Sequence, residues 1–138
     1  MATTLAQILV RLDQVLQLNA VPGTKVFSDR VDAESRDEVP CLNTVVHNGS
    51  TEPFSDDWDL YKQPVELRIS VRGDQPTLLA ELQHEAVHRP ITADATLKTL
   101  AVSVRAEDPA WERVEGDLTA VIKSTRYLFT YLIPRNTL

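Results

Sequence analysis

The hydrophobic positions near the start of the chain recur at helical spacing. In TLAQILVRLDQVLQLN, residues 4–19, apolar side chains lie three and four positions apart and so share one face of a helix. Thr3 or Thr4 can cap the start, and the Pro22-Gly23 pair ends the pattern. We predict an amphipathic helix whose packed stripe contains Leu5, Ile8, Leu9, Leu12, Val15 and Leu16.

Several later segments have the period-two pattern or the β-branched content of strands. The clearest is VELRISVRG, residues 65–73, in which apolar and charged or polar residues alternate, as in a strand buried on one face. Further strands are predicted at residues 24–29, 41–48, 101–108 and 117–134.

A second helix is predicted from Pro76 to about Arg89. Asp74 stands in position to cap it, Pro76 suits a first helical turn, and Pro90 is expected to stop it. At about 100° per residue, one set of apolar side chains clusters on one side, which we expect to pack on the sheet. This set is Leu78, Leu79, Leu82 and Ala86.

Two polar segments have no such periodicity. Residues 29–40, DRVDAESRDEVP, are read as a surface loop or a single helical turn. Residues 48–64 are rich in turn-forming residues and are predicted to be a long loop. That loop carries Phe54, Trp58 and Tyr61, which need a surface to cover, on this subunit or another. Trp111 is placed in a turn between strands, either as a local apolar plug or as an interface anchor.

The order of these elements predicts the fold class. Two main helices packed against one mostly antiparallel, mixed sheet make a two-layer α+β fold. The chain of 138 residues is the usual size of one domain, so residues 1–138 are taken as a single domain. A chain of this length buries roughly 68–70% of its unfolded surface and needs no metal or disulfide to fold.

Composition narrows the class of protein. The formal net charge is −6 and the pI is about 5.0, which argues against a basic nucleic-acid-binding surface. Cys41 is the only cysteine, so no intrachain disulfide can form, and we expect its side chain to be buried. No apolar run reaches the roughly 18–20 residues of a membrane helix, and the N-terminus lacks the basic start of a secretion signal. We expect a protein that folds in a reducing cytoplasm and has no membrane partner.

QHEAVHRP, residues 83–90, contains the H-E-x-x-H pattern of zinc hydrolases in His84, Glu85 and His88. A catalytic zinc needs a third protein ligand. The remaining histidine is His47, in another predicted strand, and nothing selects among the candidate carboxylates Glu107, Glu112 and Glu115. The helix angles put both histidines away from the predicted packed face. We therefore interpret them as exposed residues of a solvated helix face, and we expect no metal site, no catalytic residue and no cofactor.

The charged segment contains the pattern R-x-D-x-x-x-R-D-E-x-P-x-L, which consists of Arg30, Asp32, Arg36, Asp37, Glu38, Pro40 and Leu42. Together with the amphipathic N-terminal helix, the acidic loop, VELRISVRGD, AVSVRAED and TRYLFTYLI, this pattern resembles the tail terminator proteins of long-tailed bacteriophages, also called minor tail or tail completion proteins. The resemblance extends over nearly the whole chain.

The resemblance implies a structural protein of the virion, assembled in the host cytoplasm. Proteins of this family form homohexameric rings at the head-proximal end of the tail tube, where they stop tube growth and present the surface that joins the head. The partners implied are other copies of the chain, the tail tube protein and head–tail connector or neck proteins. Genome DNA passes through the ring without sequence-specific binding. The resemblance implies no enzymatic activity.

Candidate interface residues follow from the two polar segments. Mixed charges can pair across a subunit boundary, and exposed aromatic residues often anchor one. The candidates are Arg30, Asp32, Arg36, Asp37, Glu38, Phe54, Asp57, Trp58 and Tyr61. Two alternatives stay open: another neck or head–tail connector protein of the virion, and a small zinc hydrolase built on HEAVH.

Overall fold

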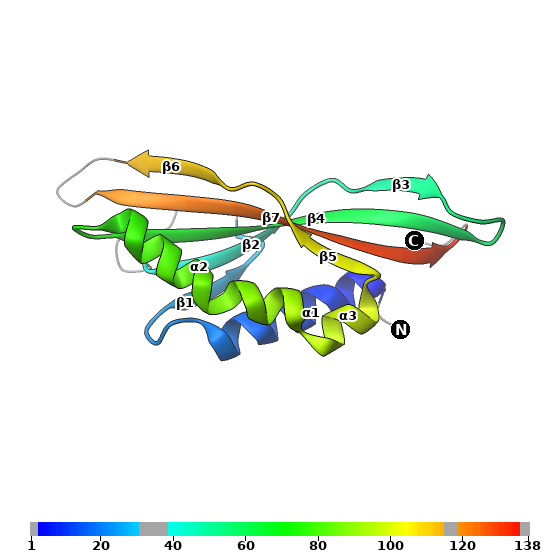
Figure 1. Ribbon diagram of the computed structural model, residues 1–138, viewed down its shortest axis with the longest axis horizontal. Helices are drawn as coiled ribbons and strands as arrows, with labels where there is room; N and C mark the ends of the chain where they lie inside the picture. Colours follow the sequence, from blue (N-terminus) through cyan, green and yellow to red (C-terminus); the bar gives the residue numbers. More distant parts are fainter. Residues whose placement is uncertain (1–2, 31–38, 115–118, 136–138) are drawn as a thin grey trace.

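The computed structural model of the chain describes residues 3–30, 39–114 and 119–135. It has an α+β fold in which the helices lie on one face of a mixed β-sheet (Figure 1), as the sequence predicted. The helices are α1 (Thr4–Asn19), α2 (Pro76–Ala93) and α3 (Ala95–Leu100). The strands are β1 (Lys25–Ser28), β2 (Cys41–Val46), β3 (Ser50–Pro53), β4 (Trp58–Arg72), β5 (Ser103–Ala106), β6 (Ala110–Val114) and β7 (Ala120–Pro134).

The sheet is built around one long antiparallel pair. Strands β4 and β7 have 15 residues each and pair along their full length, from Trp58 opposite Pro134 to Arg72 opposite Ala120. The other edge of β4 pairs with β2 and β3, and the other edge of β7 pairs with β5 and β6. Strand β1 extends the sheet parallel to β2, which makes the sheet mixed.

The core lies between the helices and one face of the β4–β7 pair. Because side chains alternate along a strand, every second residue of each strand faces the helices. The predicted alternation of β4 is confirmed: its inward residues are buried, as are most of those of β7 and the stripe of α1. Burying each large apolar side chain contributes roughly 1.5–3 kcal/mol. The largest fully buried apolar side chains are Ile8, Leu16, Leu42, Leu67, Ile69, Ile91, Leu97, Tyr127 and Phe129.

The packed face predicted for α2 was wrong. Leu78, Leu79 and Leu82 are exposed, whereas the buried positions are Pro76, Ala80, Gln83, Val87 and Ile91. The buried set recurs at intervals of three and four residues, so it too forms a helical stripe. Its small members let the helix approach the sheet closely, and the buried amide of Gln83 is satisfied by the Thr24 hydroxyl, at 2.9 Å from Nε2.

The end predicted for α2 was also wrong, because Pro90 lies inside the helix, which continues to Ala93. Proline removes one helical hydrogen bond, but the buried Ile91 keeps the last turn packed on the core. The following helix α3 was missed by the sequence analysis. Asp94 caps α3 by accepting from the Leu97 N–H at 2.9 Å, and the Arg11 guanidinium holds the same carboxylate at 2.7 Å. The hydrogen bond from Arg11 lowers the pKa of Asp94.

The loop predicted at residues 48–64 is largely a β-hairpin. It contains β3 and the first residues of β4, and the connection between these strands spans only residues 54–57. The turn-forming residues of this segment hid its strand character, because the strand partner is the distant end of β7. Likewise Trp111 lies on β6 and not in a turn. The prediction that Cys41 is buried is confirmed.

Within the described residues, no helix is long and apolar enough to cross a membrane.

A substitution at Gly49 tests how closely the atoms of the hairpin pack. A Cβ atom at this position would lie 2.6 Å from Cε1 of Tyr61 and 2.8 Å from the Lys62 carbonyl oxygen. We expect Gly49→Ala to reduce the free energy of unfolding by roughly 1–3 kcal/mol, since the backbone on one side cannot yield. Urea denaturation measures the change. Ser50→Ala at the neighbouring exposed position is the control, with an expected change within about 0.5 kcal/mol; equal stability of the two variants would contradict the close contact.

Candidate interaction site

The turn joining β3 to β4 presents two aromatic side chains to solvent. Phe54 is 61% exposed and Trp58 is 43% exposed. The turn is closed by backbone hydrogen bonds, because the N–H groups of Phe54 and Ser55 both donate to the Trp58 carbonyl oxygen, at 3.1 and 3.0 Å. We call residues 54–58 the aromatic tip. In Figure 1 it lies at one end of the molecule, where β3 meets β4.

Arg135, at the end of β7, fastens the aromatic tip. Its guanidinium donates to the Ser55 carbonyl oxygen at 2.6 Å and to Oδ1 of Asp59 at 3.2 Å. Its backbone N–H donates to the Asp57 carbonyl oxygen at 2.9 Å. The tip is thus held in one shape before any partner arrives, which reduces the entropy lost on binding. Of the predicted interface residues, Phe54, Asp57 and Trp58 are brought together here.

Tyr61 does not belong to the aromatic tip. It lies on the face of β4 that the helices cover, and its ring stacks on Tyr131 with centroids 5.4 Å apart. Its aromatic surface is therefore mainly covered by its own subunit.

The predicted charged segment is described only at its start. The Arg30 backbone pairs with the side-chain amide of Asn43, which accepts from the Arg30 N–H and donates to its carbonyl oxygen. The guanidinium of Arg30 lies 4.6 Å from the centroid of the Phe27 ring. Asp32, Arg36, Asp37 and Glu38 lie outside the described residues, so their role in subunit pairing stays a prediction.

The histidines of HEAVH are not fully solvated, which corrects the sequence interpretation. Nε2 of His84 and Nδ1 of His88 each lie 2.7 Å from the hydroxyl oxygen of Tyr127, on β7. Both side chains are half-buried because they flank the true packed stripe of α2. A phenol hydroxyl donates one hydrogen bond and accepts another. When both imidazoles are neutral, the Tyr127 hydroxyl donates a hydrogen bond to one ring and accepts one from the other.

The surroundings of His84 favour its neutral state. Burial lowers the pKa of His84 to about 4, and electrostatic repulsion from the Lys123 ammonium acts in the same direction. Burial also raises the pKa of Tyr127, so its hydroxyl stays protonated. The ammonium of Lys123 is itself held by Glu81, at 2.6 Å. The cluster fastens α2 to the sheet.

The third zinc ligand is not supplied by the described part of the chain. No group of three His, Cys, Asp or Glu side chains there could hold a metal ion. Of the carboxylates considered, Glu112 lies on β6 opposite Ile122, on the sheet face away from α2, and Glu115 is outside the described residues. The geometry of HEAVH is explained by its contact with Tyr127.

A second exposed apolar surface lies on α2. Leu78, Leu79 and Leu82 are 51%, 40% and 49% exposed and occupy neighbouring positions in the first half of the helix. We call these three residues the leucine patch. The sequence analysis missed this patch because it assigned the large leucines to the core. The stripe through Ala80, Val87 and Ile91 could have indicated that the leucines face outwards.

Comparison with known proteins gives no family assignment. The sequence matches no protein-family model, and no curated protein sequence matches it significantly.

The histidine cluster makes stability depend on pH. The unfolded histidine binds its proton near pH 6.5, whereas folded His84 does so near pH 4. Between these values protons favour the unfolded chain, so stability is full above about pH 6.5 and is lost as the pH falls towards 4. We expect a loss on the order of 1 kcal/mol from His84, less than the full shift implies because the ring is partly exposed.

Denaturation of the wild-type protein and His84→Gln at pH 7, 5.5 and 4 measures this contribution. Carboxylates titrate in both proteins, so the difference between their profiles isolates His84. Leu82→Gln, which introduces the same side chain on the exposed side of the helix, is expected to follow the wild type. A His84→Gln profile parallel to that of the wild type would rule out this role.

Proposed function

We propose that this protein is a structural subunit of a bacteriophage virion, a tail terminator. It forms a ring at the head-proximal end of the tail tube, ends tube polymerisation and provides the surface that joins the head. Its partners are further copies of itself, the tail tube protein and a connector or neck protein. The sequence resemblance described above suggests this role.

The observation that carries the proposal is the rigidly held aromatic tip. Exposed Trp and Phe side chains on a fixed support are typical anchors of protein–protein interfaces. Such a surface suits a protein whose work is contact with neighbours, and the three bonds from Arg135 hold it ready for that contact.

A second observation supports assembly into a ring. Head-to-tail contacts between identical subunits need two different complementary surfaces on each copy. The aromatic tip and the leucine patch are two such apolar surfaces, and Figure 1 shows the tip and the start of α2 at opposite ends of the β4–β7 pair. A contact between them, repeated with a closing rotation, generates a ring.

The charge of the chain is compatible with passage of DNA. With a net charge of −6, the subunit is expected to attract few phosphates, and tight phosphate binding is driven by basic side chains that release counterions. Another connector protein of the same virion would use the same kinds of surface and differs in its partner. No specific observation favours the zinc hydrolase.

Replacement of the aromatic tip tests the proposal. Purified tail tubes are mixed with the wild-type protein or with Phe54→Ser/Trp58→Ser, and electron microscopy scores tubes that carry a terminal ring. Losing an interface anchor costs about 2 kcal/mol or more, so we expect the variant to need a roughly thirtyfold or higher concentration for equal capping.

The control is Val102→Ser, which removes another exposed apolar side chain, one outside the tip and the leucine patch. It is expected to cap tubes like the wild type. Wild-type protein that leaves tube ends bare but binds purified connector would identify the neck alternative. A tip variant that caps as efficiently as the wild type would exclude the tip as the anchor.

A further inference from the structure

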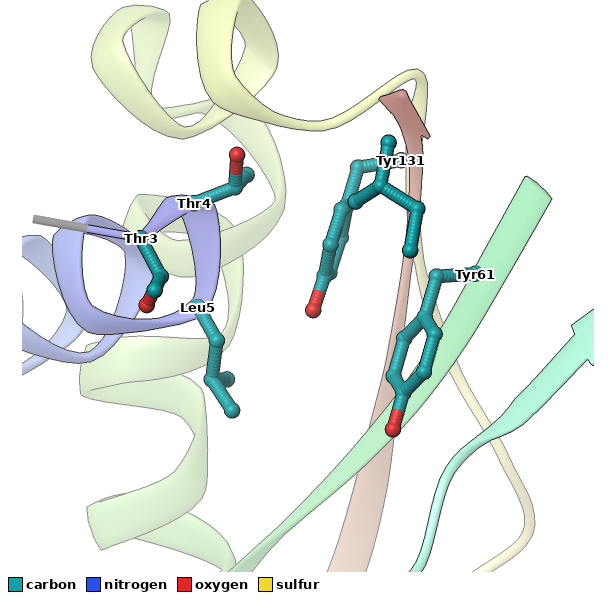
Figure 2. Close-up of a pocket in the computed structure, with 6 residues that line it drawn as sticks. Thr3, Thr4, Leu5, Tyr61 and Tyr131 are labelled. Atoms are coloured by element: carbon teal, nitrogen blue, oxygen red, sulfur yellow. The ribbon is translucent and has the colours of Figure 1, made fainter. Parts of the chain in front are cut away.

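A cavity of about 200 Å³ lies between the first turn of α1 and the ends of β4 and β7. It is lined by Thr3, Thr4, Leu5, Tyr61, Tyr131 and Ile133 (Figure 2). Its volume exceeds the roughly 150 Å³ of a cavity that holds benzene and is smaller than the roughly 300–1,000 Å³ of sites for drug-sized ligands. The cavity is therefore the size of a small organic molecule or a single side chain.

One wall of the cavity is the N-terminus of a 16-residue helix. Thr3 is its cap: its hydroxyl oxygen accepts from the Ala6 N–H at 3.1 Å, and its carbonyl oxygen accepts from the Gln7 N–H. The N–H groups of Thr4 and Leu5 precede the first bond within the helix and have no partner in it. The first turn has no acidic residue, so the partial positive charge of the helix end is not neutralised from within.

The opposite wall supplies a buried hydrogen-bond donor. Tyr131 is only 5% exposed, and its hydroxyl has no hydrogen-bonding partner in the described part of the chain. Figure 2 shows this hydroxyl pointing into the cavity, towards Thr3 and Leu5. Burial, aided by Tyr61, raises the pKa of Tyr131 to about 12, so the phenol is a neutral donor at physiological pH. The hydroxyl opens on the cavity and can therefore donate to a ligand that brings an acceptor.

We propose that this cavity binds a carboxylate carried on a short apolar stem. The carboxylate oxygens accept from the N–H groups at the start of α1 and from the Tyr131 hydroxyl. The stem packs on Leu5, Ile133 and the tyrosine rings. Among the residues that the structure describes, no lysine or arginine lines the cavity, so a single negative charge is preferred over a phosphate dianion.

The same chemistry has two sources. One is a free small acid, and the other is a glutamate side chain or chain end of a partner polypeptide. Neither source depends on the proposed role in the phage tail, so a cavity that binds no carboxylate would leave that role unaffected.

The test is an NMR titration of the full-length, 15N-labelled protein with sodium benzoate and with sodium hexanoate. We expect both acids to shift the amide signals of Thr4, Leu5 and Tyr131 in a saturable manner. Benzamide and hexanamide have the same stems without the charge, and they should bind at least roughly tenfold more weakly, since hydrogen bonds to a charged acceptor are the stronger ones.

Two variants test the role of the Tyr131 hydroxyl. Tyr131→Phe keeps the stacked ring and removes the inward hydroxyl, and we expect it to weaken benzoate binding roughly tenfold. Ser103→Ala is the control, because Ser103 is an exposed residue of β5 outside the cavity lining, and it should leave the affinity unchanged. The amide spectrum reports whether each variant is folded.

Two short peptides distinguish the sources. One, blocked at both ends, presents a glutamate side chain, and the other ends in a free phenylalanine carboxylate. A peptide that shifts the same signals at lower concentration than benzoate would assign the cavity to a partner chain, whereas binding of the free acids alone would assign it to a small molecule. The proposal is overturned if neither acids nor peptides shift these signals, or if Tyr131→Phe binds benzoate as tightly as the wild-type protein.

Discussion

The pairing of β4 with β7 is the constraint on which the rest of the structure depends. Each strand offers two edges, and the 15-residue ladder uses one edge of each. The remaining edges are each long enough for two shorter strands in succession: β2 and β3 on one side, and β5 and β6 on the other. The aromatic tip, the cavity and the histidine cluster are positioned by this pair, because each of them contacts one of its two strands.

The helix layer adapts to the ladder through small and polar side chains. Helix α2 approaches the sheet along Ala80, Gln83 and Val87, which turns its leucines outwards and places His84 and His88 beside Tyr127. Two polar contacts at this boundary are satisfied in pairs, Gln83 with Thr24 and Lys123 with Glu81. Because unpaired buried polar groups are costly, these pairs fix the position of the helix more narrowly than apolar contact would.

Local pattern accounts for the parts of the fold that the sequence predicted correctly. The stripe of α1 and the alternation in β4 each repeat often enough to identify both the element and its buried face. The errors have a different physical origin. The start of β4 and strand β6 are strands because β7 supplies their partners from far along the chain, and no local signal carries that information. The sequence of α2 contains two helical stripes that could face the sheet. The stripe of large leucines was predicted because of its apolar area. The other stripe is the buried one, since closeness of approach between helix and sheet matters as much as apolar area. The aromatic residues of the tip were identified from composition, but their attachment to Arg135 and the cavity beside α1 require the three-dimensional arrangement.

The attachment of the aromatic tip by Arg135 also affects when the tip takes its final shape during synthesis of the chain. The tip spans residues 54–58, yet the side chain and backbone that fix its shape belong to residue 135. During synthesis, about 77 residues separate the emergence of the tip from that of its clamp, by subtraction of 58 from 135. At roughly 5–20 residues per second, this interval lasts several seconds. The aromatic tip therefore takes its fixed shape only after Arg135 has been synthesised, and a shorter nascent chain lacks the groups that hold it.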